Sequence, residues 1–160
     1  MEVKLAYHVA FLVKEMDAAI PHFEKALGVR FRPPETLTRV DQPDGSPGIP
    51  VLSTYSYEGP LYVQLIEAQP AGVYGIQQGE GFHHFGVWVD DAEECRQVLG
   101  QEGIGTEMRF ARDEETSAWY CNPGDLHGIR VEYTGEVVRS GVESWLRGET
   151  ALEDVSSASP

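Results

Sequence analysis

The stretch FHHFGVWVDDAEECRQVLGQEGIGTEMRF, Phe82 to Phe110, has the pattern of a strand, a helix and a further strand in direct succession. Residues up to Val89 are mostly apolar, aromatic or small, as is typical of a short strand. Apolar residues then recur at helical spacing, at Ala92, Cys95, Val98 and Leu99. Gly103 follows as a helix-ending residue. The stretch therefore predicts a β-α-β unit.

A second copy of this pattern occurs earlier, in AYHVAFLVKEMDAAIPHFEKALGVRF, Ala6 to Phe31. When the two stretches are aligned, His8 falls on His84. The earlier helix has apolar residues at Ala18, Ala19, Phe23, Ala26 and Leu27. Gly28 then ends it. Such self-similarity indicates a duplicated structural unit.

Three stretches with strand composition follow each predicted helix. After the first helix they are FRPPETLTRV, PVLSTYSYE and LYVQLIEA, and after the second they are GTEMRFA, SAWYCNP and GIRVEYTG. Each half thus predicts β-α-β-β-β, and the whole predicts an α+β domain over residues 1–135. We expect module one at residues 5–70, a Gly-rich linker at 71–80 and module two at 81–135. Residues 136–160 predict a short helix and a disordered tail.

Composition excludes several classes of function. The chain has 160 residues and a formal net charge of −14, so we expect no binding to nucleic acid or to an anionic membrane surface. No apolar run approaches the roughly 20 residues that span a bilayer, and the N-terminus lacks a signal-peptide pattern. We therefore expect a cytoplasmic protein. Cys95 and Cys121 are far apart and are expected to be reduced.

Two adjacent histidines, His83 and His84, stand at the head of the strand that opens module two. Neighbouring residues on a strand point to opposite faces. His84 shares a face with Gly86, whereas His83 shares the face of Phe85, Val87 and Val89, which is expected to pack against the helices. We therefore expect His84 to point away from the helices, and His83 to point toward the helix side or the sheet edge.

The last strands of the two halves add a second matched pair. When YVQLIE is aligned with RVEYTG, Gln64 falls on Glu132. The repeat thus offers four side chains at equivalent positions: His8, Gln64, His84 and Glu132. Imidazole, amide oxygen and carboxylate are suitable ligands for a divalent Co, Ni, Zn, Mn or Fe ion. An inward carboxylate without a cation is costly to bury, which favours one metal ion per chain. Gln64 has an alternative role, as a hydrogen-bonding group for the substrate.

Four segments in this order, YHVAFLVKEMDAAIPHFEKALG, VQLIEA, HHFGVWVDD and NPGDLHGIRVEY, resemble the vicinal oxygen chelate superfamily. That superfamily includes glyoxalase I, methylmalonyl-CoA epimerase, extradiol dioxygenases and drug-resistance proteins. The resemblance implies paired modules that curl into a cup-shaped, partly open β-barrel with helices outside. It also implies that His8, Gln64, His84 and Glu132 hold the metal, a set similar to that of methylmalonyl-CoA epimerase.

The resemblance further implies isomerase, epimerase or lyase chemistry on a small carbonyl substrate such as an acyl-CoA, with Glu132 as the catalytic carboxylate. The epimerases carry another glutamate on a strand before the Gln-bearing one, whereas IPVLSTYSYEG has no carboxylate before Glu58. One alternative is an extradiol-type ring-cleavage dioxygenase with a His/His/Glu iron site, in which His127 or Tyr120 would serve in proton transfer. Another alternative is a non-catalytic small-molecule-binding protein.

Two further expectations concern neighbours of the site. Four tyrosines lie in strands expected to line the cup: Tyr55, Tyr57, Tyr62 and Tyr120. Members of the superfamily often associate, so we expect a homodimer, with the segment GVESWLRG as a candidate contact through Trp145 and Leu146.

Overall fold

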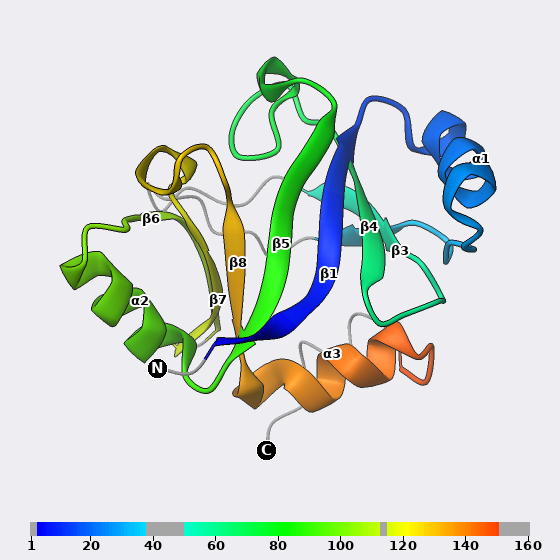
Figure 1. Ribbon diagram of the computed structural model, residues 1–160. Helices are drawn as coiled ribbons and strands as arrows, with labels where there is room; N and C mark the ends of the chain where they lie inside the picture. The colour runs from blue at the N-terminus through cyan, green and yellow to red at the C-terminus, as the bar shows by residue number, and fades with distance from the viewer. Residues whose placement is uncertain (1–2, 38–49, 113–114, 151–160) are drawn as a thin grey trace.

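A computed structural model describes residues 3–37, 50–112 and 115–150 (Figure 1). The elements of the first half are β1 (Val3–Val13), α1 (Met16–Leu27), β2 (Glu35–Leu37), β3 (Val51–Tyr55) and β4 (Tyr62–Glu67). Those of the second half are β5 (Gly81–Val89), α2 (Ala92–Gln101), β6 (Thr106–Arg112), β7 (Glu115–Cys121) and β8 (Val131–Gly135). The β-α-β-β-β order predicted for each half is confirmed. The predicted tail falls largely outside the described residues.

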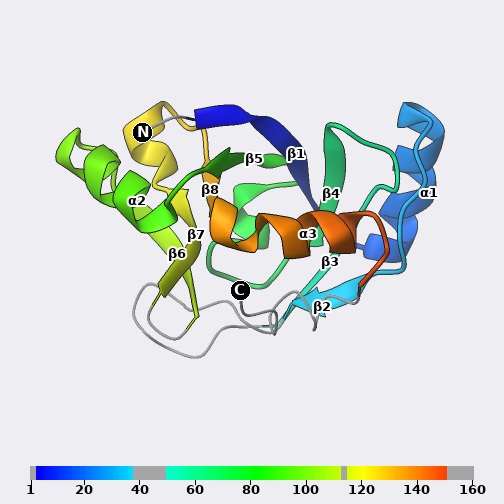
Figure 2. The ribbon, with the colours of Figure 1, turned by 90° about the horizontal axis from the view of Figure 1, so that it is seen from below.

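The strands form a single sheet in the order β2-β3-β4-β1-β5-β8-β7-β6. The order is symmetric about the antiparallel pair β1 and β5, each of which has a parallel neighbour from its own half. Figure 1 shows β1 and β5 side by side at the centre, with α1 and α2 on opposite sides. Seen from below, the sheet arches over its concave side (Figure 2). The predicted α+β cup is thus confirmed.

α1 and α2 pack on the outer side of the sheet. In the first half, Val13 lies in a buried cluster against which Val9, Phe11 and Phe23 pack. In the second half, Val87 and Val89 pack with Ala92 and Cys95 of α2, as the alternation predicted. Phe85, predicted to lie on the same packed face, is 38% exposed, so this expectation was wrong. The two helices sit toward the edges of the sheet and leave this part of β5 uncovered (Figure 1).

The concave side is covered by two segments outside the repeat. Val73 and Tyr74, from the segment between β4 and β5, are buried in a cluster with Ala10 and Leu12 of β1. This segment also contains the short 3-10 helix η1 (Ile76–Gln78). The contacts are made because Ala10 and Leu12, two residues apart on β1, point to the same face.

The second segment on the concave side follows the repeat and contains η3 (Glu136–Val138) and α3 (Arg139–Leu146). α3 lies across the opening of the arch (Figure 2). Trp145 and Leu146 are 7% and 1% exposed and pack with Tyr55. They are part of the chain's own core, so their expected role as a dimer contact was wrong, while the homodimer itself stays a prediction. No helix in the described part of the chain is long and apolar enough to cross a membrane.

Candidate metal centre

Strand pairing places the four predicted ligands in two neighbouring rows of the central sheet. The first row, across β4, β1 and β5, consists of Gln64, Ala10 and His84. The second row, across β1, β5 and β8, consists of His8, Gly86 and Glu132. Residues that pair across neighbouring strands turn their side chains to the same face. Each row thus has a small residue at its centre and potential ligands on both sides.

Three of the four predicted ligands converge closely. His8 Nε2 lies 2.9 Å from His84 Nε2, and Glu132 Oε2 lies 3.3 Å from each of these nitrogens. With metal–nitrogen bonds of about 2.0–2.1 Å, neighbouring ligand atoms lie about 3.0 Å apart in an octahedron and about 3.4 Å apart in a tetrahedron. The three atoms therefore have the spacing of donors to one divalent ion. Among the described residues, His8, His84 and Glu132 form a group whose donor atoms lie close enough together to hold one metal ion.

Gly86 makes room for His8. A Cβ atom at position 86 would lie 2.0 Å from Cε1 and 2.2 Å from Nδ1 of the His8 ring. Carbon atoms in contact are normally about 3.5–4.0 Å apart. The His8 ring therefore occupies the space that any larger residue at position 86 would need.

Gln64 supplies the fourth predicted donor. Its side chain is buried, and its Nε2 donates to Ser53 Oγ at 3.0 Å, which orients the amide. Its Oε1 is buried and has no hydrogen-bond partner among the described residues. A buried amide oxygen without a partner costs free energy, so it is suited to a metal ion or to a substrate donor.

Burial sets the protonation of the cluster. His8 and His84 are fully buried. Desolvation lowers the pKa of each to about 3, although for His8 the charge of Glu132 acts in the opposite direction. Both rings are therefore neutral near pH 7, which is the form that binds a metal. Desolvation raises the pKa of Glu132, and the neighbouring His8 opposes this shift.

A β-bulge precedes each of the two histidines. On β1, Ala6 pairs with Val87 and His8 with Gly86, so Tyr7 is an extra residue. On β5, the register shifts between the partners of Ala10 and Phe11, so His83 is the extra residue there. An extra residue interrupts the alternation of side chains. Tyr7 and His83 occupy equivalent positions in the repeat.

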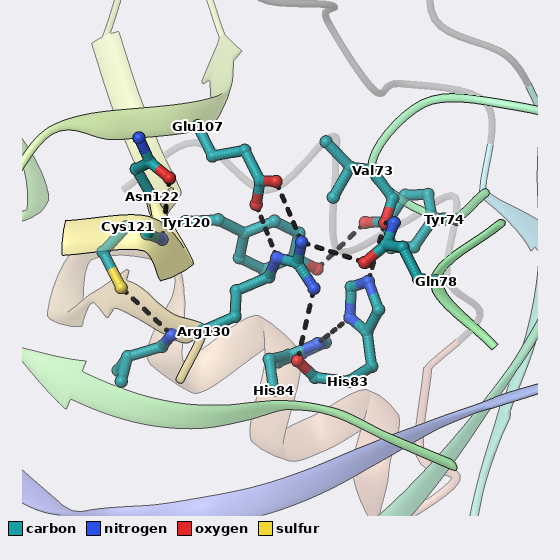
Figure 3. A network of polar contacts seen from close by, with 12 residues as sticks. Val73, Tyr74, Gln78, His83, His84, Glu107, Tyr120, Cys121, Asn122 and Arg130 are labelled. Atoms are coloured by element: carbon teal, nitrogen blue, oxygen red, sulfur yellow. Dashed lines mark hydrogen bonds and ion pairs between the residues drawn. The ribbon is translucent and has the colours of Figure 1, made fainter. Parts of the chain in front are cut away.

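The bulge brings His83 to the site. Its Nδ1 lies 2.7 Å from His84 Nδ1, and its Nε2 lies 2.9 Å from the Val73 carbonyl oxygen (Figure 3). The expectation that His83 points to the helix side or the sheet edge was therefore wrong. Strand alternation could not have shown this, because a single extra residue reverses the order of faces.

Aromatic rings surround the cluster. Two of the expected tyrosines contact it: the Tyr55 ring lies 5.5 Å from the His8 ring, and the Tyr120 ring lies 4.8 Å from the His84 ring. Of the other two, Tyr57 is 45% exposed, and Tyr62 packs beside α3. His127 is exposed in the turn after β7, so among the residues considered for proton transfer it is Tyr120 that lies at the site.

Two tyrosines at the site were not predicted. The Tyr7 ring lies 4.5 Å from the His8 ring and stacks on Trp88 at 4.1 Å. The Tyr74 hydroxyl lies 2.9 Å from the Tyr120 hydroxyl. For Tyr7 the sequence offered one signal: it directly precedes His8, just as His83 directly precedes His84. Tyr74 lies in the Gly-rich segment, which has no periodicity to interpret.

Comparisons with known proteins agree with this architecture. Residues 7–121 match the model of a family described as the glyoxalase/bleomycin resistance protein/dioxygenase superfamily. Methylmalonyl-CoA epimerase from Mycobacterium tuberculosis superposes with a TM-score of 0.63 at 18% identity, covering 83% of this chain and 88% of that chain. A variant of the Streptomyces coelicolor epimerase superposes with a TM-score of 0.61 at 16% identity, covering 84% and 95%. At these identities the likeness shows the fold alone. No curated protein sequence matches the chain.

Proposed function

Because the chain belongs to the glyoxalase/bleomycin resistance protein/dioxygenase superfamily, we propose that it is a metal-dependent enzyme that moves a proton next to a carbonyl group. The reaction would be of the epimerase, isomerase or lyase type. The observation that supports this proposal is the triangle of His8 Nε2, His84 Nε2 and Glu132 Oε2 on the concave side of the sheet.

In this proposal His8, His84 and Glu132 hold the ion, with Gln64 as the fourth ligand. A bound divalent ion would polarise a substrate carbonyl and so make the neighbouring C–H bond more acidic. The side chain of Glu132 is 13% exposed, whereas those of His8 and His84 are 0% exposed. A substrate would therefore meet the cluster from the Glu132 side.

Glu132 is proposed as the base. Glu132 Oε2 belongs to the triangle with the two histidines, so Oε1 of the same carboxylate would be the oxygen left to accept a proton. The strand beside Gln64, β3, has the sequence VLSTY and carries no carboxylate. Glu58 is engaged elsewhere, since Arg30 donates to it from both backbone and side chain. Glu132 would thus carry the proton transfer that a separate glutamate carries in the epimerases.

Tyr55 is proposed to donate a hydrogen bond to the substrate. Burial raises the pKa of its hydroxyl well above the usual value, with neighbouring groups such as Tyr7 and Glu132 adding to the shift. The hydroxyl therefore keeps its proton near neutral pH. A protonated phenol beside His8 can stabilise negative charge that develops on a substrate oxygen.

The proposed substrate class is an acyl-CoA thioester. The support comes from the solved structures that share the fold, one of which holds 2-nitronate-propionyl-CoA and another methylmalonyl-CoA. A thioester carbonyl has an acidic neighbouring C–H, so it suits a site built from a metal centre and a carboxylate.

A second candidate function is ring cleavage by an iron site of the extradiol type. It is favoured by one observation, namely that two nitrogens and one carboxylate oxygen already form a closed triangle without Gln64. Two histidines and a carboxylate are the ligand set of many non-haem iron oxygenases. Tyr120 would then assist proton transfer, because its ring contacts that of His84.

Metal analysis of protein purified without added metal tests the centre. We expect about one ion per chain in the wild type, little in His84→Ala, and wild-type content in the control His22→Ala, because His22 is an exposed residue of α1. Equal metal content in all three proteins would remove His84 from the site.

Exchange in D2O tests the reaction. The metal-loaded protein is expected to exchange the α-proton of acyl-CoAs, Glu132→Gln to lose this activity, and the exposed control Glu102→Gln to keep it. Oxygen consumption with a catechol and iron, without exchange, would replace proton transfer by the dioxygenase candidate. If the protein binds metal but shows neither reaction, both proposed activities are refuted.

A further inference from the structure

His83 connects a predicted ligand to the segment that covers the concave side. Its side chain is buried at 4% exposure, and its ring stacks on Tyr74 with a centroid distance of 5.2 Å. One ring nitrogen faces His84 and the other faces the backbone of Val73 (Figure 3). Both nitrogens of His83 are therefore engaged within the chain.

The chemistry of these contacts determines which atoms carry protons. The Val73 carbonyl oxygen can only accept, so His83 Nε2 carries a hydrogen and donates to it. A neutral imidazole carries one N–H, so His83 Nδ1 is an acceptor. His84 Nδ1 must then carry the hydrogen that His83 accepts. It follows that His84 Nε2 bears a lone pair, and this atom is the one that faces His8 and Glu132.

We infer that His83 is a positioning residue, which holds His84 in the form whose Nε2 is free to bind the metal ion. The inference rests on the proposed function, in which His84 is a ligand. Groups that hydrogen-bond the second nitrogen of a ligand histidine fix its tautomer and orientation, and their removal typically costs about 10–100-fold in metal affinity. Here that group is a second histidine supplied by a bulge.

The acceptor at Val73 is itself held in place. Gln78 Nε2 donates to the same carbonyl, and Arg130 donates to Gln78 Oε1 at 3.1 Å. Arg130 also forms a two-fold contact with Glu107, with distances of 2.5 and 2.8 Å (Figure 3). The Arg130 guanidinium lies near His83, with 3.4 Å from its Nη1 to the His83 carbonyl oxygen. The network thus holds in place the acceptor to which His83 Nε2 donates.

Two substitutions separate this role from simple packing. In His83→Asn, the amide oxygen can take the position of Nδ1 and accept from His84, but the ring is lost. In His83→Phe, the ring between Tyr74 and Tyr120 is kept, but the acceptor is lost. We expect His83→Asn to bind Zn²⁺ or Co²⁺ within about threefold of the wild type and His83→Phe to bind about 10–100-fold more weakly, measured by competition with a chelator.

A nuclear magnetic resonance measurement on metal-free protein provides a second readout. With ¹⁵N-labelled histidine, and His84→Ala to assign the signals, His84 is expected to carry its proton on Nδ1 in the wild type and in His83→Asn. In His83→Phe the proton is expected on Nε2 in part or all of the molecules. The tautomer is read without metal, so it tests His83 even if the wild type were to bind no ion and the proposed function were to fail.

The opposite order of affinities would overturn the inference. If His83→Phe kept wild-type metal affinity while His83→Asn lost it, His83 would act by packing alone. A wild-type His84 with its proton on Nε2 would contradict the hydrogen-bond directions directly.

Discussion

Gly86→Ala is expected to disable the metal centre while leaving the fold intact. The added methyl group would lie 2.0 Å from Cε1, 2.2 Å from Nδ1 and 2.8 Å from Nε2 of the His8 ring. Ordinary carbon contacts need about 3.5 Å or more, so the ring has to move by about 1.5 Å. Alanine at position 86 causes no backbone strain, because Gly86 lies in β5 and is not one of the glycines with a positive φ.

The displacement is large compared with the tolerance of a metal site. His8 Nε2 lies 2.9 Å from His84 Nε2. A ring movement of about 1.5 Å takes this nitrogen away from the point at which the three donor atoms could share one ion. Functional constellations need placement within about 0.5 Å, and a misplacement of about 1 Å can cost roughly 100-fold. We therefore expect the dissociation constant for Zn²⁺ or Co²⁺ to rise about 100-fold or more. Overpacking is expected to lower the free energy of unfolding by about 1–3 kcal/mol.

Chelator competition measures the affinity, and thermal unfolding of the metal-free protein verifies that the variant is folded. Gly100→Ala is the matched control, because Gly100 is exposed in α2 and a Cβ atom added there would have no neighbouring atom within 4 Å. That variant is expected to keep its metal affinity and to gain about 0.5–1 kcal/mol in stability. A folded Gly86→Ala protein that binds metal as tightly as the wild type would show that His8 is not a ligand in the observed geometry.

Three further outcomes are expected. Free metal at 100 times its dissociation constant is expected to stabilise the wild type by about 2.7 kcal/mol in thermal unfolding, and His8→Ala is expected to lose this gain. Hydrogen bonds from Arg96 lower the pKa of Glu93 to about 2 from 4.5. The stabilisation by the Glu93 carboxylate is therefore present above pH 4.5 and lost as the pH falls toward 2, so the difference in free energy of unfolding between the wild type and Glu93→Gln should shrink over that range in acid titrations followed by denaturant unfolding. Trp145→Ala is expected to destabilise the protein by about 3–5 kcal/mol because the side chain is buried, whereas its oligomeric state by light scattering should be unchanged.

Duplication made much of the architecture predictable. One strand-helix pattern occurs twice, and aligning the two copies matches His8 with His84 and Gln64 with Glu132. Strand alternation then placed His8 and His84 on one face, away from the helices, and their Nε2 atoms lie 2.9 Å apart. These predictions succeeded because residue periodicity and repeat position are both local properties of the sequence.

The unpredicted features arise where periodicity is interrupted or absent. Tyr7 and His83 are extra residues in bulges. Strict alternation of side chains along the strand therefore assigned His83 to the wrong face and gave no reason to consider Tyr7. Val73 contacts His83, ten residues later in the chain, and its segment has no repeating pattern. The sequence of α3 predicts a short helix. Whether its Trp145 packs inside its own chain or against another chain depends on the tertiary structure, which places it beside Tyr55.

The paired bulges make the two equivalent histidines chemically unequal. His83 accepts a hydrogen from His84, so the protonated nitrogen of His84 is determined before an ion arrives. Tyr7, at the matching place, lies within hydrogen-bonding distance of Thr134 instead, and His8 Nδ1 has no hydrogen-bond partner among the described residues. Of the two proposed ligands, His84 thus has a neighbouring side chain that sets its tautomer, whereas no described residue contacts His8 Nδ1 in this way. The backbone repeat is symmetric here, but the hydrogen bonds around its two histidines are not.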